Sequence, residues 1–329
     1  MLIYGIDVSK EHLDIFCLHQ DVIIYQKRIK NKFSAINLFL KSIKPQAVLC
    51  AEYTGIYSNL LVHLACCMNI KIALASGYEI KHSMGNPRGK SDLIDAQRIW
   101  EYANRFFDKL LFRELEEPNF TEIKSLFNFR NQLTKALKSL TIAKTSSKNQ
   151  VACSVAECKF REETETQLKL QIKKVEKELI TLIKSNQKLS KNFELVTSIT
   201  GIGPITAIEL IISTGNFKRI DSPRKAAAYA GICPYPNQSG NIKKKQRIHF
   251  RSNKKLKSLL HMCAKTICNH NKEFKFYRER KMMEGKHFYL VMNNVSNKII
   301  RTVYAVIQSG KPFDINHITI DPRCKTKIT

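Results

Sequence analysis

The stretch Leu2–Lys10, LIYGIDVSK, sets the fold of the first third of the chain. Its Leu, Ile, Tyr, Ile and Val residues predict a buried strand, and Asp7 stands near the end of that strand. A carboxylate among apolar neighbours is costly to bury unless it is paired or bound to metal, so we expect Asp7 to face a cleft. A solvated Asp on an edge strand is the alternative that this stretch leaves open.

The segments after this strand predict a mixed sheet. Two runs rich in Ile, Val, Phe and Tyr follow with almost no residues between them, which predicts an antiparallel meander. Helices and strands then alternate, which favours parallel pairing in the second half of the sheet. The expected elements are strands over 12–19 and 21–29, a helix over 33–43, a strand over 47–51, a helix over 56–68 and a strand over 70–75.

Three further carboxylates fall at chemically suitable places. Glu52 ends the second buried strand, as Asp7 ends the first. Asp92 and Asp95 lie three residues apart in the first turn of a predicted helix over 91–105, so they share one helical face. Helix capping alone would also explain acids in a first turn. Together, the four acids could converge and hold two hard divalent cations through oxygen, about 4 Å apart, as phosphoryl transfer requires.

The composition points to a nucleic-acid partner. The chain has 329 residues, 43% of them hydrophobic, and a net charge of +27 from 55 basic and 28 acidic residues. Such a balance repels itself unless a polyanion is the usual partner. The ten cysteines include no CxxC pair, and there is no secretory signal pattern, so we expect reduced thiols and a cytoplasmic protein. No apolar run reaches the length of about 20 residues that crosses a bilayer.

The middle of the chain, residues 113–191, predicts two long helices that form a helical hairpin or a coiled coil. One apolar stripe contains Phe129, Leu133, Leu137 and Leu140, and a second follows a heptad-like spacing. The members of the second are Leu168, Ile172, Val175, Leu179 and Leu182. The seam could pair two helices of one chain, or it could join two copies, and the pattern does not decide between them.

The last third, residues 192–310 before a tail over 311–329, predicts a mostly helical domain. Two apolar helices meet at Gly201 and Gly203, and this resembles a helix-hairpin-helix whose backbone N–H groups could contact a DNA phosphate. A tight turn between packed helices is the alternative. Further on, Ser239-Gly240 leads into a segment with eight basic and no acidic residues, so the Ser239 hydroxyl could serve as a nucleophile against a phosphate. Such Ser-Gly pairs are also common in turns.

The residues that we expect to contact nucleic acid are basic side chains, hairpin glycines and one helix-start asparagine. They are Arg88, Lys90, Gly201, Gly203, Lys243, Lys244, Lys245, Arg247, Arg251, Asn253, Lys254, Lys255 and Lys257.

Taken together, the motifs resemble those of the DEDD-type transposases of bacterial insertion sequences, relatives of the Piv-type DNA invertases. The matching residues are GIDVSK with Asp7, AEYTGIY with Glu52, KSDLIDAQ with Asp92 and Asp95, and AAYAGICP followed by Ser239-Gly240. The sequence departs from the family pattern at Ser252, which stands where the family usually has glycine before Asn253.

The resemblance implies an N-terminal RuvC-like ribonuclease H fold over 1–112, with the four acids as ligands of Mg²⁺, two ions in all. It also implies a transposase domain with Ser239 as nucleophile, double-stranded DNA as substrate, a structured bridge RNA as guide, and a homo-oligomer, either dimer or tetramer. Acids and serine could then come from different subunits. The family implies a bacterial cytoplasmic enzyme that cuts and rejoins DNA.

Two other functions remain compatible with the residues. A RuvC-like junction nuclease would use the four acids with water and leave Ser239 idle. A basic nucleic-acid-binding scaffold would need none of the acids. An actin-like kinase also begins with a GxDxS-like strand, but the chain has no glycine-rich nucleotide loop of the GxxxxGK[ST] type, and its charge does not suit that class.

Overall fold

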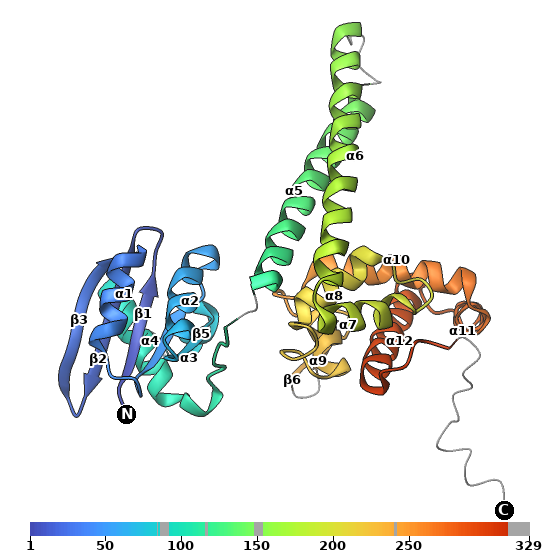
Figure 1. Ribbon diagram of the computed structural model, residues 1–329. Helices are drawn as coiled ribbons and strands as arrows, with labels where there is room; N and C mark the ends of the chain where they lie inside the picture. The colour runs from blue at the N-terminus through green and yellow to red at the C-terminus, as the bar shows by residue number, and fades with distance from the viewer. Residues whose placement is uncertain (84, 86–91, 116–117, 148–153, 240–241, 315–329) are drawn as a thin grey trace, which may run out of the picture. The chain divides into compact units, whose positions relative to one another are not determined.

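The computed structural model describes residues 1–83, 85, 92–115, 118–147, 154–239 and 242–314. The chain divides into two compact units, Met1–Glu117 and Pro118–Thr329. Each unit is described by itself (Figure 1). In the described ranges, no helix combines the length and the apolar character that crossing a membrane would need.

The first unit is built on a five-stranded mixed sheet in the order β3-β2-β1-β4-β5. Strand β1 pairs antiparallel with β2 and parallel with β4, which confirms the predicted mixed sheet and its meander. The strands are β1 (Ile3–Val8), β2 (His12–His19), β3 (Val22–Lys30), β4 (Val48–Glu52) and β5 (Lys71–Ala75). The helices are α1 (Phe33–Ser42), α2 (Asn59–Cys67), α3 (Gly77–Ser83) and α4 (Asp92–Arg105), with short 3₁₀ turns η1 (Gly55–Ser58) and η2 (Phe107–Lys109).

Alternation along β1 sends its side chains to two different layers. Tyr4, Ile6 and Val8 join the apolar core beneath α1 and α2. Gly5 lies under α4, where a Cβ atom would come within 2.3 Å of the Ala96 carbonyl oxygen. The glycine therefore lets α4 rest directly on the sheet, on the same face of β1 as Asp7.

The second unit is almost entirely helical around one core. Its helices are α5 (Pro118–Ser147), α6 (Val155–Lys184), α7 (Gln187–Thr197), α8 (Pro204–Thr214), α9 (Pro223–Tyr229), α10 (Lys254–His270), α11 (Lys272–Met283) and α12 (Phe288–Ser309). Residues from α5 through α12 contribute to a single apolar cluster. The segment predicted as a separate helical part therefore shares its core with the last third, and the three-part division of the chain stays a prediction.

Helices α5 and α6 lie side by side in one chain (Figure 1). The predicted stripe on α5 is found in part: Leu133 packs against the core, but Phe129 is exposed, and Ile123 and Phe127 are buried instead. The buried face of α5 runs through Ile123, Phe127 and Arg130, at helical spacing, and Arg130 pairs with Glu176 of α6 at 2.7 Å. On α6, Ile172, Val175 and Leu179 are buried, and Ile183 rather than Leu182 ends the buried stripe.

The basic segment after Tyr235 forms a hairpin that the sequence pattern did not predict. Strand β6 (Tyr235–Ser239) pairs antiparallel with β7 (Ile242–Arg247). The AAYAGICP stretch spans the end of α9. Its glycine, Gly231, lies just after the helix and adopts a φ of +65°. Helices α3 and α11 were also not predicted as separate elements.

Candidate active site

A row of polar residues crosses four strands on the face that α4 covers. Asp7 of β1 lies opposite Asp14 of β2, and Asp14 lies opposite Arg28 of β3. On the other side of β1 lies the parallel strand β4, where Ala51 pairs with Ile6. Asp7 and Glu52, the next residue of each strand, are therefore neighbours. Directly opposed residues project to the same face of a sheet, so three carboxylates stand in one line.

Helix α4 adds the other two predicted acids to this face. Its packing across β1 and β2 is fixed by Gly5 and by Trp100, whose ring meets that of Phe16 edge-on at 5.8 Å. Asp92 and Asp95 lie in the first turn of α4. Asp92 accepts a 2.6 Å hydrogen bond from the Arg28 guanidinium, and Asp95 accepts one of 2.9 Å from Arg98.

The carboxylates interact through their charges. The pKa of Asp7 is raised to about 6, first by burial and then by the negative charges of Glu52, Asp95, Asp92 and Asp14, in that order of importance. Burial also raises the pKa of Glu52, with a further contribution from Asp95. The four predicted acids therefore share one electrostatic environment, although they come from three separate elements of the chain.

Glu52 is placed by a close approach at the start of α3. A Cβ atom on Gly77 would lie only 2.2 Å from Glu52 Oε1, so the carboxylate occupies the space that a side chain at this position would fill. The end of β4 is fixed by its neighbour, because the Tyr53 backbone N–H donates to the Ala75 carbonyl at 2.8 Å. The Glu52 carboxylate is held in position by these two features.

Asp14 and Arg28 belong to this site, and the sequence reasoning passed over both. Asp14 is only 4% exposed, and Arg28 Nε donates to it at 2.9 Å while another guanidinium nitrogen reaches Asp92. The signal was present in HLDIF, where Asp14 sits in an apolar strand just as Asp7 does. A buried carboxylate is stable only when it is paired, and Arg28 on the adjacent strand of the meander is the cation that pairs with Asp14.

The donor set suits a hard divalent cation in its chemistry. All the predicted ligands are carboxylates, and oxygen ligands are those that Mg²⁺ prefers. Among the described residues, no group of three or more His, Cys, Asp or Glu is yet arranged closely enough to hold a metal ion. Arg28 and Arg98 instead occupy oxygens of Asp92 and Asp95. The four acids therefore fit a divalent cation in their charge and in the type of ligand atom.

Ser239 is the last residue of β6, in the second unit. Its backbone pairs with Ile242 across the hairpin, and Gln238 pairs with Lys243. The hairpin thus places Ser239 beside the strand that carries Lys243, Lys244 and Lys245 in its sequence. Gly240 and the side chains of Ser239 and of 242–246 lie outside what the structure describes.

The remaining predicted nucleic-acid contacts fall into two groups. Arg247, Arg251 and Lys254 are exposed, and Lys257 is half-buried. Asn253 and Lys255 instead turn inward. Asn253 accepts from the Leu256 backbone N–H as the cap of α10 and donates to Glu209, while Lys255 pairs with Glu209 at 2.7 Å. Arg88 and Lys90 lie outside the described residues.

The two hairpin glycines have different surroundings. Gly201 has a φ of +91°, and a Cβ atom there would meet the Cys263 carbonyl oxygen of α10 at 3.1 Å. Packing alone thus accounts for Gly201. Gly203 precedes α8, and the structure shows open space around it. A phosphate contact at this turn stays a prediction, and Gly203 has the freer approach.

Comparison with known proteins identifies the family of the chain. The transposase model DEDD_Tnp_IS110 matches residues 4–151, which include all four predicted acids, and the model for IS116/IS110/IS902 family transposases matches residues 193–278, which include Ser239. The chain is a DEDD-type transposase. This transposase is 26% identical over 275 residues to the pilin gene-inverting protein of Moraxella bovis, covering 81% of each chain. It is 25% identical over 303 residues to the transposase for insertion sequence element IS1111A of Coxiella burnetii, covering 82% of this transposase and 79% of that protein. The chain is therefore a DNA recombinase or transposase enzyme.

Proposed function

We propose that this transposase cuts and rejoins double-stranded DNA of an insertion sequence through a covalent serine–phosphate intermediate. The observation that carries the proposal is the line of carboxylates Glu52, Asp7 and Asp14, with Asp92 and Asp95 on the helix above it. A protein with a net charge of +27 that keeps such a line on one face concentrates negative charge where a phosphate must approach. A cation bound between the carboxylates and the phosphate would overcome the repulsion between these negative charges.

Asp7, Glu52, Asp92 and Asp95 would hold Mg²⁺, two ions in all. Transposases of this family use divalent metal ions. Magnesium bound there would stabilise negative charge on the phosphate oxygens and on the leaving oxygen. Arg28 of β3 and Arg98 of α4 hold the carboxylates of Asp92 and Asp95 by their hydrogen bonds.

Ser239 is the nucleophile in this mechanism. Its oxygen attacks the phosphorus, a serine–phosphate bond forms, the bond to the 3′-oxygen breaks, and the proton of the hydroxyl ends on that leaving oxygen. Attack by a 3′-hydroxyl of another strand reverses the step, restores Ser239 and joins the new ends. The phosphoester bond is conserved throughout, so no nucleotide cofactor is needed.

A structured bridge RNA would choose target and donor sites, and a homo-oligomer would bring acids and serine of different subunits together. The excess of basic residues can accommodate an RNA as well as DNA. Large exposed apolar side chains on α5 and α6 support association between copies: Phe129, Ile142, Val155, Phe160 and Leu170. We place the enzyme in the bacterial cytoplasm.

Covalent trapping tests the proposal. The full-length protein with its co-purified nucleic acid is incubated with Mg²⁺ and labelled DNA that contains candidate junctions, then quenched in denaturant. Sequencing of the co-purified nucleic acid identifies the guide. We expect a protein–DNA adduct that peptide mass spectrometry locates at Ser239, and we expect Ser239→Ala and Asp7→Asn to lose it.

The matched control is Ser252→Ala, which removes a hydroxyl from the same unit and should keep the adduct. The proposal fails if Ser239→Ala still joins strands, or if wild type joins strands without an adduct. Cleavage by Ser239→Ala without protein attachment would instead identify a nuclease that uses water.

A further inference from the structure

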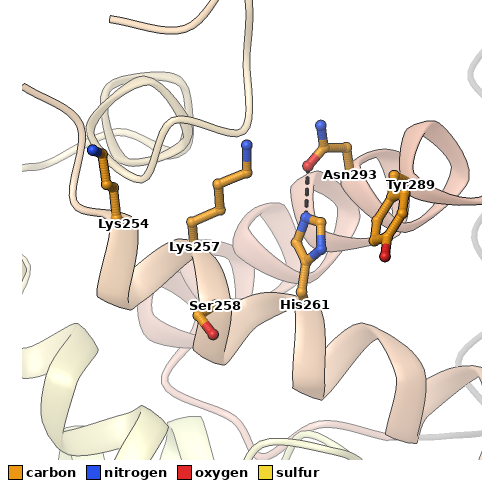
Figure 2. A pocket seen from close by; sticks show the side chains of 6 residues that line it. All are labelled: Lys254, Lys257, Ser258, His261, Tyr289 and Asn293. Atoms are coloured by element: carbon orange, nitrogen blue, oxygen red, sulfur yellow. Dashed lines mark hydrogen bonds between the residues drawn. The ribbon is translucent and has the colours of Figure 1, made fainter. Parts of the chain in front are cut away.

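A hollow of about 400 Å³, lined by side chains that carry polar groups, lies between α10 and α12. Figure 2 shows the side chains that line it: Lys254, Lys257, Ser258, His261, Tyr289 and Asn293. The first four come from α10 and the last two from α12. None of the six is acidic, and α10 as a whole contains no Asp or Glu.

The charge of this hollow is not compensated within the described part of the chain. Of the three lysines in the first turns of α10, Lys255 turns inward to Glu209 and to the ring of Phe127, 3.9 Å from its centroid. Lys254 and Lys257 extend to the same side of α10, as Figure 2 shows, and no described acid forms an ion pair with either of them. Two ammonium groups on one side of a helix form a site for a polyanion.

The hydrogen bond between His261 and Asn293 fixes a further donor. His261 Nε2 lies 2.7 Å from Asn293 Oδ1, and since that oxygen can only accept, Nε2 carries the proton. The amide nitrogen of Asn293 then points away from His261, to the side toward which the lysines extend (Figure 2). Lys254, Lys257 and Asn293 thus present N–H donors, which match the acceptor oxygens of a phosphodiester.

Tyr289 adds an aromatic surface to these donors. Its side chain is 64% exposed near the start of α12, and the ring of His287 lies beside it at 5.6 Å with an interplanar angle of 26°. Tyr289 lies across the His261–Asn293 pair from the two lysines (Figure 2), and an exposed tyrosine at the end of a row of donors offers a stacking platform for a base. Bases in a duplex have their faces covered by neighbours, so only an unpaired base can use this platform.

We propose that this hollow binds a single-stranded nucleic-acid segment, with Lys254 and Lys257 on its phosphates and an unpaired base stacked on Tyr289. The inference rests on the proposed function only in taking nucleic acid as the partner. It adds a strand-type preference to the second unit, separate from the chemistry of Ser239. Unpaired RNA and unpaired DNA share this chemistry, and the test separates them.

The experiment measures binding of the full-length protein, freed of co-purified nucleic acid, by fluorescence anisotropy. The probes are oligo(U), oligo(dT) of equal length and a duplex of equal length. We expect Tyr289→Leu to weaken single-strand binding about tenfold and Tyr289→Phe to retain it, with duplex binding unchanged by either. Loss on one single strand only would identify that strand as the ligand.

The lysines are tested through salt dependence. Replacing both Lys254 and Lys257 by Gln should reduce the slope of log K against log salt for single strands by about 1.4, or about 0.7 for each lost phosphate contact. The matched control replaces Lys265 and Lys272, two exposed lysines outside the hollow, and should leave the slope unchanged. Circular dichroism confirms that each variant is folded.

Equal effects of Tyr289→Leu on duplex and single strands, no effect on either, or an unchanged slope in the double lysine variant would overturn the proposal. The covalent adduct at Ser239 is a separate readout. If wild type forms no adduct but Tyr289→Leu still loses single-strand binding, the serine mechanism fails and this site stands. The reverse result rejects this site alone.

Discussion

Replacing Asp7 by asparagine should stabilise the first unit while it removes the activity. The pKa of Asp7 is raised from 3.8 to about 6 by burial and by the neighbouring acids, so folding favours its neutral form. The contribution of Asp7 to stability is therefore greatest below pH 3.8 and is lost as the pH rises through about 6. A shift of about two pKa units corresponds to about 3 kcal/mol, which is an upper limit because Asp7 is only partly buried.

The single tryptophan of the chain makes this change measurable. Trp100 lies on α4 against Phe16, so its fluorescence in urea reports unfolding of the first unit. At pH 7.5 in EDTA, Asp7→Asn should raise the free energy of unfolding by up to about 3 kcal/mol, and at pH 5 by about half of that. The matched control is Glu11→Gln, the same chemical change at an exposed position of this unit, which should have little effect.

Two results would refute the reasoning. If Asp7→Asn destabilises the unit at pH 7.5, the carboxylate makes a favourable contact that outweighs its burial and the repulsion of its neighbours. If the gain is the same at pH 5 and pH 7.5, ionisation of Asp7 is not its source. Added Mg²⁺ should stabilise wild type and leave Asp7→Asn unchanged, because only the four-acid site binds it.

Three further changes test the surroundings of the two sites. Gly77→Ala should reduce DNA joining by about 100-fold, because its Cβ would lie 2.2 Å from Glu52 Oε1 and displace the carboxylate. Ser252→Ala should raise the stability of the second unit by about 1 kcal/mol, measured by circular dichroism in urea, because the buried Ser252 hydroxyl has no hydrogen-bond partner among the described residues. Glu209→Ala should lower it by about 2–3 kcal/mol, below the range for a fully buried pair, since the Lys255 side chain is 38% exposed.

The controls separate these effects from general unfolding. Gly77→Ala should keep the Trp100 unfolding midpoint, and full activity in this variant would show that Glu52 tolerates displacement. Unchanged or lower stability of Ser252→Ala would mean that the hydroxyl is satisfied. Glu209→Gln keeps the side-chain shape and an acceptor for Ser213 and Asn253, so it should lower the stability less than Glu209→Ala. Equal losses of stability in the two variants would exclude a contribution from these hydrogen bonds.

The sequence predicted the sheet well because its signals were local. The apolar run in Leu2–Lys10 and the Ile-, Val-, Phe- and Tyr-rich run in 12–19 were enough to predict both strands. The acids Asp7, Glu52, Asp92 and Asp95 were found from their positions at element ends, and the structure places them on one face. Asp14 was missed because it lies inside its strand and not at an element end, although its place among apolar residues marked it, and the pairing register then shows that it stands opposite Asp7.

Other features depend on contacts between distant segments. Asn253 and Lys255 read as part of a basic tract, yet a buried Glu209 more than 40 residues earlier draws both inward. The predicted stripe on α5 included Phe129, which is exposed, and Leu133, which packs against the core, because the packing partner of a long helix decides which of its apolar residues are covered. The presence of Ser252, where the family usually has glycine, is also explained only by a contact with a residue distant in the sequence. Its side chain lies where a Cβ on Gly231 would come within 2.6 Å of its oxygen, so the missing side chain of Gly231 makes room for it.

The pairing of β1 with β2 has a consequence for errors in folding. Ser9 fixes the turn between these strands, with its backbone N–H donating to the His12 carbonyl at 2.9 Å and its Oγ accepting from the His12 N–H at 3.1 Å. A slip of β1 by one residue would carry Asp7 to the opposite face, where Tyr4, Ile6 and Val8 meet α1 and α2. A misfolded copy would then lack the acidic face altogether. Molecules with this slipped register should therefore lack strand-cleavage activity, so the Ser9 turn makes activity depend on the correct pairing of β1 with β2.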